Sequence, residues 1–177
     1  MRILVFATAL LLAACTGKPS LDDAKLSDRE FNLEEFFEGR TVAYGQFQDV
    51  FGTVRRRFEV TIDGTWDGET LRLVEDFIYE DGSVEQRIWT LQKTGKQTWQ
   101  GTASGVDGVA LGEERGDTFN WRYTIDLPIV SAEGTDMLRV TFDDWMWLLS
   151  EDRLLNIAYM KRFGVDIGAV TITFEKE

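Results

Sequence analysis

Apolar and polar residues alternate along most of the chain from Thr41 onwards. In one of the clearest runs, Trp121 and Tyr123 flank Arg122. A period of two is typical of a β-strand with one buried face, and Asp-Gly pairs between the runs are typical of tight turns. The pattern predicts nine strands, near residues 41–51, 53–62, 69–79, 84–93, 97–106, 118–128, 137–149, 153–161 and 167–175.

Evenly spaced antiparallel strands with one apolar face each bury those faces by packing as a sandwich or by closing into a barrel. Closure removes unpaired sheet edges and leaves an interior that holds one small ligand. We therefore expect an all-β fold, a closed or nearly closed antiparallel β-barrel of about 8–10 strands of the lipocalin or calycin type. A β-sandwich is the alternative.

One short helix is expected before the strands. Ser27 and Glu30 have the spacing of a helix capping box. Phe36 and Phe37 follow, and Gly39 is expected to end the helix. The phenylalanines are predicted to plug one end of the barrel.

The beginning of the chain has the pattern of a bacterial lipoprotein signal. Arg2 precedes an apolar run that ends in Leu12-Ala13-Ala14-Cys15. The run is too short to span a bilayer, so we interpret it as a signal cleaved before Cys15. Several lipid chains on Cys15 would hold the protein on a membrane, where a single chain binds only marginally. An ordinary secreted protein with a chance cysteine is the alternative.

This interpretation divides the chain into a signal peptide at 1–14, a lipidated tether at 15–26 and one barrel domain at 27–177. The expected location is the periplasmic face of a membrane in a bacterial cell envelope. Thr16 rather than an aspartate follows Cys15. In a Gram-negative cell this favours the outer membrane over the inner membrane.

The composition argues against several kinds of chemistry. Acidic residues number 31 against 19 lysines and arginines, and the net charge of −12 repels nucleic acid and anionic lipid headgroups. Histidine is absent, which removes the commonest general base and the usual zinc ligand. Cys15 is the only cysteine, so no disulfide forms within the chain. The sequence also lacks phosphate-binding loops, nucleophile elbows and metal-binding spacings, and predicts no cofactor or metal.

Several polar residues fall on the apolar faces of the predicted strands. Because buried charge is costly unless it is paired, an arginine of this set is expected to pair with Glu75 or Asp144. Such pairs either fix the strand register or orient the polar head of an amphiphilic ligand in a cavity. A bulge that turns some of them outward is the third possibility. The residues predicted to line the interior are Arg56, Glu75, Arg87, Trp89, Asp144 and Asn156.

Two further patterns leave alternatives open. Gly101, Ala103 and Gly105 share the face of Trp99, where small side chains either leave cavity volume or let a neighbouring element approach closely. A second apolar face on the 137–149 strand needs cover from the helix near Phe36, or forms an exposed patch for a partner or a membrane. That face consists of Trp145, Trp147 and Leu149.

Spaced motifs along nearly the whole chain resemble the proteobacterial lipoprotein family known as domain of unknown function 3833. The resemblance implies a lipocalin-like or calycin-like barrel on a membrane anchor, and it carries no catalytic residue. The motifs include Phe36-Phe37-Glu38-Gly39, Phe47-Gln48-Asp49, Leu73-Val74-Glu75-Asp76-Phe77, Trp121-Arg122-Tyr123, Phe142-Asp143-Asp144-Trp145-Met146 and Phe163-Gly164.

Three functional classes follow from these observations. The first, which we favour, is a lipid-anchored protein whose barrel binds an apolar or amphiphilic molecule such as a fatty acid. The second is a structural or assembly protein of the cell envelope, in which six tryptophans and twelve phenylalanines fill the barrel and no ligand binds. The third is an enzyme, which would have to use carboxylates such as Glu75 and Asp144 for acid–base work.

Overall fold

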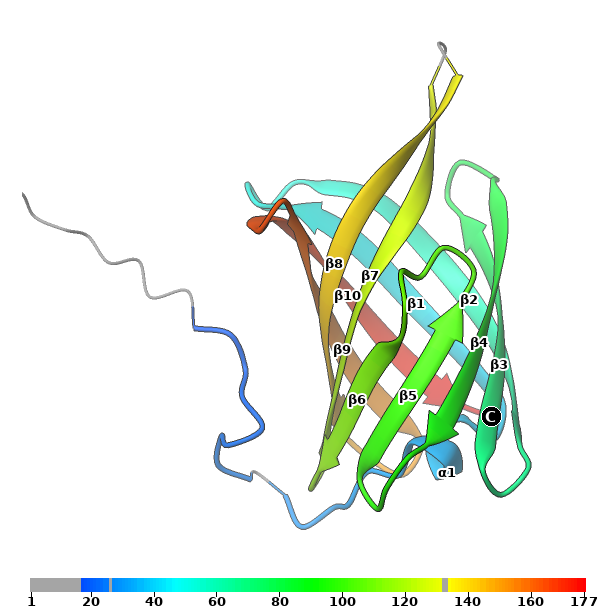
Figure 1. Ribbon diagram of the computed structural model, residues 1–177, viewed down its shortest axis with the longest axis vertical. Coiled ribbons are helices and arrows are strands. Elements are labelled where there is room, and N and C mark those ends of the chain that lie inside the picture. Colours follow the sequence, from blue (N-terminus) through cyan, green and yellow to red (C-terminus); the bar gives the residue numbers. More distant parts are fainter. Residues whose placement is uncertain (1–16, 26, 132–133) are drawn as a thin grey trace, which may run out of the picture.

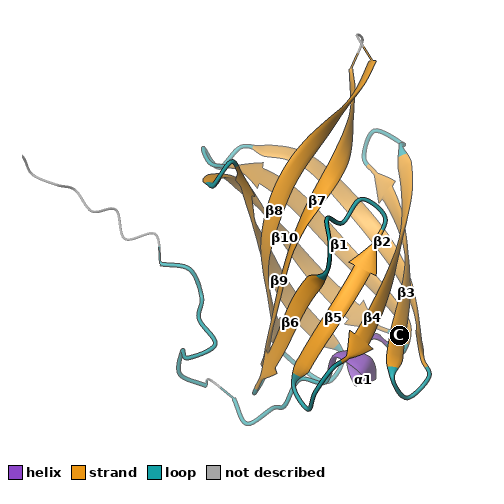
Figure 2. Ribbon diagram, viewed as in Figure 1, coloured by secondary structure: helices purple, strands orange, loops and turns teal. Residues whose placement is uncertain are grey.

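The computed structural model describes residues 17–25, 27–131 and 134–177, and the proposed signal peptide and Cys15 lie outside them. The described chain forms a single closed antiparallel barrel of ten strands with one short helix (Figures 1 and 2). Its elements are α1 (Leu33–Phe37), β1 (Gly39–Asp49), β2 (Val54–Trp66), β3 (Thr70–Tyr79), β4 (Val84–Lys93), β5 (Thr98–Ala103), β6 (Ala110–Arg115), β7 (Thr118–Ser131), β8 (Gly134–Leu148), β9 (Arg153–Arg162) and β10 (Val165–Lys176).

The barrel closes through pairing of its first and last strands. Each strand pairs with the next one in the chain, and Thr41 of β1 lies opposite both Ile62 of β2 and Lys176 of β10. No strand of the described sheet therefore keeps a free edge. The predicted all-β barrel is confirmed, and the sandwich is excluded. All the strands and the helix that plugs the barrel lie within residues 27–177, so the closed fold is complete there.

The sequence pattern missed one strand, β6. Its alternation is the reverse of the usual one, because Ala110 and Glu114 are buried while Leu111 is 55% exposed. Glu114 is buried because its carboxylate accepts hydrogen bonds from the Leu33 amide, at 2.8 Å, and from the Trp99 indole, at 3.0 Å. The inward residues of β6 are small or acidic, so its sequence lacks the row of alternating apolar residues by which the other strands were predicted.

The helix α1 closes the lower end of the barrel in Figure 1. Phe36 and Phe37 are buried, and the Phe37 ring meets Phe174 of β10 edge-on at 5.6 Å between centroids. The predicted plug is therefore confirmed. The predicted capping box is wrong: the N-cap is Asn32, and the Ser27 hydroxyl instead donates a hydrogen bond to Asp117 at 2.5 Å.

The small residues of β5 and β6 allow close approach of an aromatic ring. A Cβ atom on Gly101 would lie 2.7 Å from the Trp121 ring, and one on Gly112 would lie 2.5 Å from the same side chain. The volume left by these glycines is thus occupied by Trp121. The small residues of β5 were expected either to leave cavity volume or to let a neighbouring element approach closely. At Gly101 the second alternative is found.

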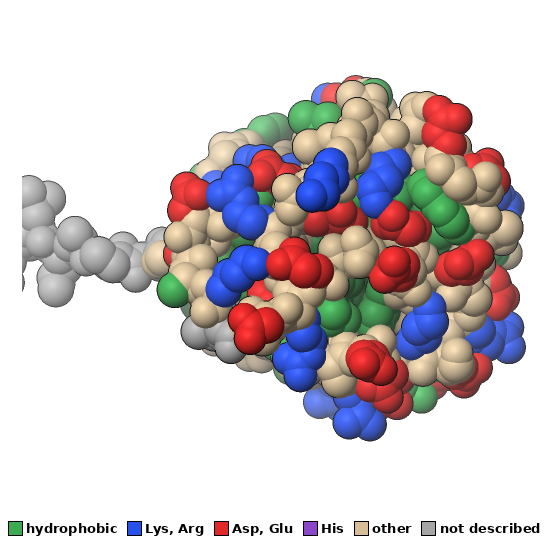
Figure 3. Space-filling model, turned by 90° about the horizontal axis from the view of Figure 1, so that it is seen from below, with side chains coloured by type: hydrophobic (Ala, Val, Ile, Leu, Met, Phe, Trp, Pro, Cys, Tyr) green, Lys and Arg blue, Asp and Glu red, His purple; other side chains and the backbone are tan. Residues whose placement is uncertain are grey.

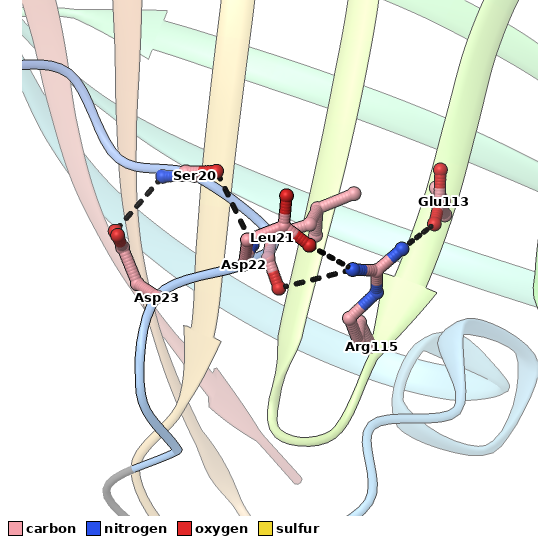
Figure 4. Close-up of polar contacts among 6 residues, drawn as sticks. All are labelled: Ser20, Leu21, Asp22, Asp23, Glu113 and Arg115. Carbon is pink, nitrogen blue, oxygen red and sulfur yellow. Dashed lines mark hydrogen bonds and ion pairs between the residues drawn. The ribbon is translucent and has the colours of Figure 1, made fainter.

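The segment 17–25 lies along the outer wall of the barrel. Lys18 forms an ion pair with Asp166 at 2.7 Å. Figure 4 shows Arg115 of β6 joined to the Asp22 carboxylate, at 2.6 Å, and to Glu113, at 2.8 Å. The described part of the expected tether is therefore attached to the barrel at Lys18 and at Asp22.

This segment also covers Trp145, one residue of the second apolar face of the 137–149 strand. Pro19 and Leu21 line one recess of the outer wall together with Trp145, which is only 5% exposed. The expectation that the helix near Phe36 supplies this cover is wrong, because α1 lies inside the lower end of the barrel. Trp147 packs on Trp145 with ring centroids 6.5 Å apart, and Leu149 stays exposed. Within the described ranges, no helix is long and apolar enough to cross a membrane.

Candidate ligand cavity

The barrel encloses a cavity of about 290 Å³. Leu33 and Phe37 form its floor at the lower end, next to α1. At the other end, which we call the upper end, Arg56 both lines the cavity and exposes about half of its side chain, at 47%. The cavity therefore extends from the helical plug to the end of the barrel where β1 and β2, and β3 and β4, are joined.

The structure places all six sequence-predicted interior residues on the wall of this cavity. They are Arg56, Glu75, Arg87, Trp89, Asp144 and Asn156. Most of the remaining wall is apolar, and aromatic rings pack against one another across it. Trp89 of β4 meets Tyr123 and Trp121 of β7 edge-on, at 5.1 and 5.7 Å between centroids.

The cavity arginines do not pair with the carboxylates expected from the sequence. Arg87 instead forms an ion pair with Glu85 at 2.7 Å, and the Tyr79 hydroxyl donates a hydrogen bond to the same carboxylate at 2.8 Å. Burial, with this hydrogen bond adding to it, raises the pKa of Tyr79 to about 12. Arg87 and Glu85 are two residues apart on one strand, so both side chains point to the same face. That spacing was the signal that could have identified Glu85.

Arg56 also differs from the expected ion pairing. Its guanidinium lies 3.3 Å from the centroid of the Tyr79 ring, a cation–π contact, and donates a hydrogen bond to Ser83 at 2.9 Å. The carboxylate closest to it is Asp81, at 3.9 Å. Arg56 is therefore a cation at the upper end of the cavity rather than half of a buried pair.

Glu75 faces the cavity without a hydrogen bond. It lies opposite Arg87 in the β3–β4 register, yet its carboxylate makes no hydrogen bond or ion pair with any residue that the structure describes. Burial raises the pKa of Glu75 to about 7; the charge of Asp144 adds to this shift and that of Arg87 opposes it. Near neutral pH the Glu75 carboxyl is therefore protonated in some molecules and ionised in others. The protonated form donates a hydrogen bond, and the ionised form only accepts hydrogen bonds.

Asp144 is the second such group and comes from the other side of the barrel. Its strand, β8, is five strands from β3 in either direction around the ring. Asn156 donates a hydrogen bond to the Asp144 carboxylate and another to the Trp145 carbonyl, at 3.0 Å. Burial raises the pKa of Asp144 to about 7, and the hydrogen bond from Asn156 opposes part of this shift.

Tyr123 completes the polar groups of the wall and was not singled out from the sequence. Its ring stacks on Phe142 at 5.0 Å, and its hydroxyl has no hydrogen-bond partner among the described residues. Burial raises the pKa of Tyr123 well above its ordinary value, and the charge of Asp144 adds to this. In the alternating pattern of its strand Tyr123 occupies an apolar position, so the pattern does not reveal its hydroxyl group.

An apolar cavity with a few convergent polar groups is the usual form of a small-molecule site. The described residues contain no cluster of three or more side chains that could hold a metal ion. The polar groups of the wall supply hydrogen bonding, charge and proton exchange, through Arg87, Glu75, Asp144 and Tyr123.

A closed ten-stranded antiparallel barrel around such a cavity defines the chain as a lipocalin-like protein. The chain belongs to the family described as "Protein of unknown function (DUF3833)", whose family model matches residues 9–176. The family resemblance noted in the sequence is thereby confirmed. Curated proteins give no significant sequence match.

Solved structures share the barrel fold. The S-type phycobiliprotein lyase CPES from Guillardia theta superposes with a TM-score of 0.59 at 14% identity, over 83% of this chain and 93% of that chain. The redesigned β-barrel mFAP1, bound to DFHBI, gives a TM-score of 0.42 at 10% identity, over 81% of this chain and 97% of that chain. At such identities the likeness to the lyase establishes the fold alone.

Proposed function

We propose that this protein is a lipid-anchored protein of the bacterial cell envelope whose barrel binds one apolar or amphiphilic small molecule, such as a fatty acid. The cavity inside the barrel carries this proposal. Its volume of about 290 Å³ is close to the lower limit of small-molecule pockets, roughly 300 Å³.

The apolar wall favours a ligand over an empty interior. An apolar cavity that stays empty destabilises a folded protein by roughly 24 cal/mol per Å³. For the present volume this would offset much of the net stability of a domain. Water could bond to Glu75, Asp144 and Tyr123, but it gains little from the surrounding rings. A bound hydrocarbon chain contacts those rings and removes the empty volume.

The polar groups suggest how an amphiphilic ligand lies. Arg56 is at the upper end and half exposed, whereas Leu33 and Phe37 form an apolar floor. A carboxylate head is therefore placed at the upper end, near Arg56, with its chain directed toward α1. Glu75 and Asp144 then face the middle of the ligand, where their raised pKa values let them lie protonated beside it.

The anchor is proposed from the sequence motif that ends at Cys15. The mature protein is expected to carry acyl groups on this residue and to partition into membranes. Its mass should exceed that of the unmodified chain, and Cys15→Ser should abolish both the mass increase and the membrane association. An unmodified mature protein would remove the anchor from the proposal and leave the cavity unaffected.

The ligand is tested by native mass spectrometry of the chain that begins at Thr16, which contains the complete barrel. We expect a stoichiometric adduct that is released on denaturation and identified as a fatty acid or lipid. Uptake from a series of fatty acids should be reduced by Ala158→Phe, which fills the cavity, and retained by Thr102→Phe, which faces outward. A clean mass with no uptake would overturn the proposal in favour of a structural barrel.

A further inference from the structure

The two most exposed large apolar side chains of the described chain lie in turns at the upper end of the barrel. Phe51 and Phe163 are 89% and 90% exposed, and Val50 and Val165 beside them are 55% and 66% exposed. The lower end, seen in Figure 3, is covered largely by charged and polar side chains of both signs. Among the described turns at that end, Leu149 is the exposed large apolar residue.

Val50, Phe51, Phe163 and Val165 form one surface, which we call the aromatic tip. Phe51 lies in the turn after β1 and Phe163 in the turn before β10, and these two strands are paired, with Asp49 opposite Gly168. Figure 1 shows the two turns side by side at the upper end. The tip therefore lies on the rim of the same end to which the cavity extends, and the β7–β8 hairpin reaches further out from that end (Figure 1).

Phe163 combines high exposure with an unusual backbone conformation. Its φ of +51° lies in the left-handed region, where asparagine or glycine is favoured and a bulky side chain is uncommon. The two-residue turn of Phe163 and Gly164 requires this backbone, since both residues have positive φ. An aromatic residue here is also unfavourable for its solvation at 90% exposure, and a contact that buries the ring outside the chain removes that cost.

Two cations beside Phe163 are not compensated by a carboxylate of the described chain. Residues 49–57 and 161–166 contain five arginines and lysines, and the three arginines at 55–57 each lie within 4 Å of a carboxylate, that of Asp49, Asp81 or Glu80. Lys161 and Arg162 have no acidic partner within ion-pair distance among the described residues, and the Arg162 guanidinium lies 5.1 Å from the Phe163 ring. At physiological salt, charges more than about 8 Å from a surface are largely screened. A surface that touches the tip therefore meets the tip's cations rather than the net charge.

The start of the described chain lies at the same place. Lys18 is held by Asp166, next to Val165, and its ammonium lies 4.9 Å from the Tyr159 ring. Cys15 is three residues earlier, which limits its distance from Lys18 along the chain to about 11 Å. If Cys15 carries the proposed lipid, the anchor is attached within about 11 Å of Lys18.

We propose that the aromatic tip docks on a phospholipid bilayer that contains anionic lipids, with Phe51 and Phe163 in the interfacial layer. Exposed aromatic side chains with neighbouring cations are the features by which interfacial segments bind membranes. A second copy of this chain fits less well as the partner. Two tips in contact would bring the positive charges of Lys161 and Arg162 in one copy close to those in the other, and like charges repel. The docking turns the upper end of the cavity toward the bilayer, from which a lipid ligand would enter.

The test uses the chain from Thr16, which lacks the anchor, in sedimentation with vesicles of phosphatidylcholine alone or mixed with phosphatidylglycerol. We expect binding to the mixed vesicles that weakens as salt is added. Phe51→Ser and Phe163→Ser should each lower the partition coefficient about tenfold, and together about a hundredfold, since each removes one buried phenyl ring. Lys161→Glu with Arg162→Glu should abolish the preference for the anionic lipid.

Leu149→Ser, an equally apolar change at the lower end, is the matched control and should leave binding unchanged. Equal loss in this control, or unchanged binding in the double phenylalanine variant, would overturn the proposal. So would the absence of vesicle binding together with a dimer that Phe51→Ser disrupts, because the tip would then be an interface between copies. These assays need no cavity ligand, so their failure is separate from failure of the ligand proposal.

Discussion

Glu75 and Arg87 lie directly opposite each other on β3 and β4, yet Arg87 forms its ion pair with Glu85, at 2.7 Å. Glu75 therefore faces the cavity with its charge only partly compensated. Burial of this carboxylate disfavours the ionised form, and the Asp144 charge increases the effect. The relationship links the electrostatics of the cavity to the stability of the fold.

Stability is expected to fall as the pH rises from about 4.5 to 7. The pKa of Glu75 is raised to about 7 in the folded protein, so over this interval the folded state binds a proton that the unfolded state has released. Glu75→Gln removes this loss and should stabilise the protein at pH 8 by about 2–3 kcal/mol relative to its effect at pH 5. Urea unfolding at both pH values measures the difference.

Asp144 titrates in the same range, so a reduced slope rather than none is expected in the Glu75→Gln variant. Glu59→Gln, on the outer face of β2, is the control and should keep the slope of the unmodified protein. A wild-type protein that is equally stable at pH 5 and pH 8 would contradict the raised pKa values.

Arg87→Met is expected to destabilise the barrel by about 1–3 kcal/mol, because it leaves Glu85, which is partly exposed, and Glu75, which faces the cavity, without their nearest cation. Adding Glu85→Gln should restore part of the lost stability, since it removes the negative charge that Arg87→Met leaves without a partner. Thermal or urea unfolding of the four proteins in a double-mutant cycle gives the coupling energy.

Ligand uptake by the Arg87→Met variant distinguishes the two interpretations of this residue. A stability loss with unchanged uptake assigns Arg87 a structural role. Reduced uptake at a temperature where the variant is folded assigns it a role at the ligand. Additive losses in the cycle would instead show that Arg87 and Glu85 do not interact.

Gly112→Ala should destabilise the barrel by about 1–3 kcal/mol, because the added methyl group meets the Trp121 and Phe119 rings at 2.5 and 2.6 Å. Gly17→Ala, where nothing lies within 4 Å, is the matched substitution and should have little effect. The unfolding temperatures of the two variants provide the comparison. Equal unfolding temperatures of the two variants would mean that the Trp121 and Phe119 rings can move away from the added methyl group without loss of stability.

Removing residues 17–25 should expose Trp145, which the segment covers. We expect a red shift of tryptophan emission and faster hydrogen exchange in β8, with the barrel still closed. Arg115→Gln alone should cost less than about 1 kcal/mol, because its ion pairs are exposed. Unchanged emission after the deletion would show that the segment does not shield this face.

Local rules were sufficient for much of this structure. Alternation along a strand is a property of the backbone, so the sequence by itself determined that the fold is all-β and that Glu75, Arg87, Asp144 and Asn156 point inward. Closure into a barrel was the favoured arrangement of these strands, with a sandwich as the alternative, and only the tertiary structure decided between them. The reversed pattern of β6 marks the limit of this rule, because Glu114 is buried by hydrogen bonds from Leu33 and Trp99 that are distant in the sequence.

The tertiary structure decided what each inward or outward side chain meets. The alternation along β4 places Arg87 on the inner face. The ion pair of Arg87 with Glu85 rather than with Glu75 follows only from the packing of the barrel. The cover over Trp145 and the placement of the Phe51 and Phe163 turns at one end likewise depend on contacts between segments more than a hundred residues apart. Such contacts arise from closure of the barrel, which no local pattern specifies.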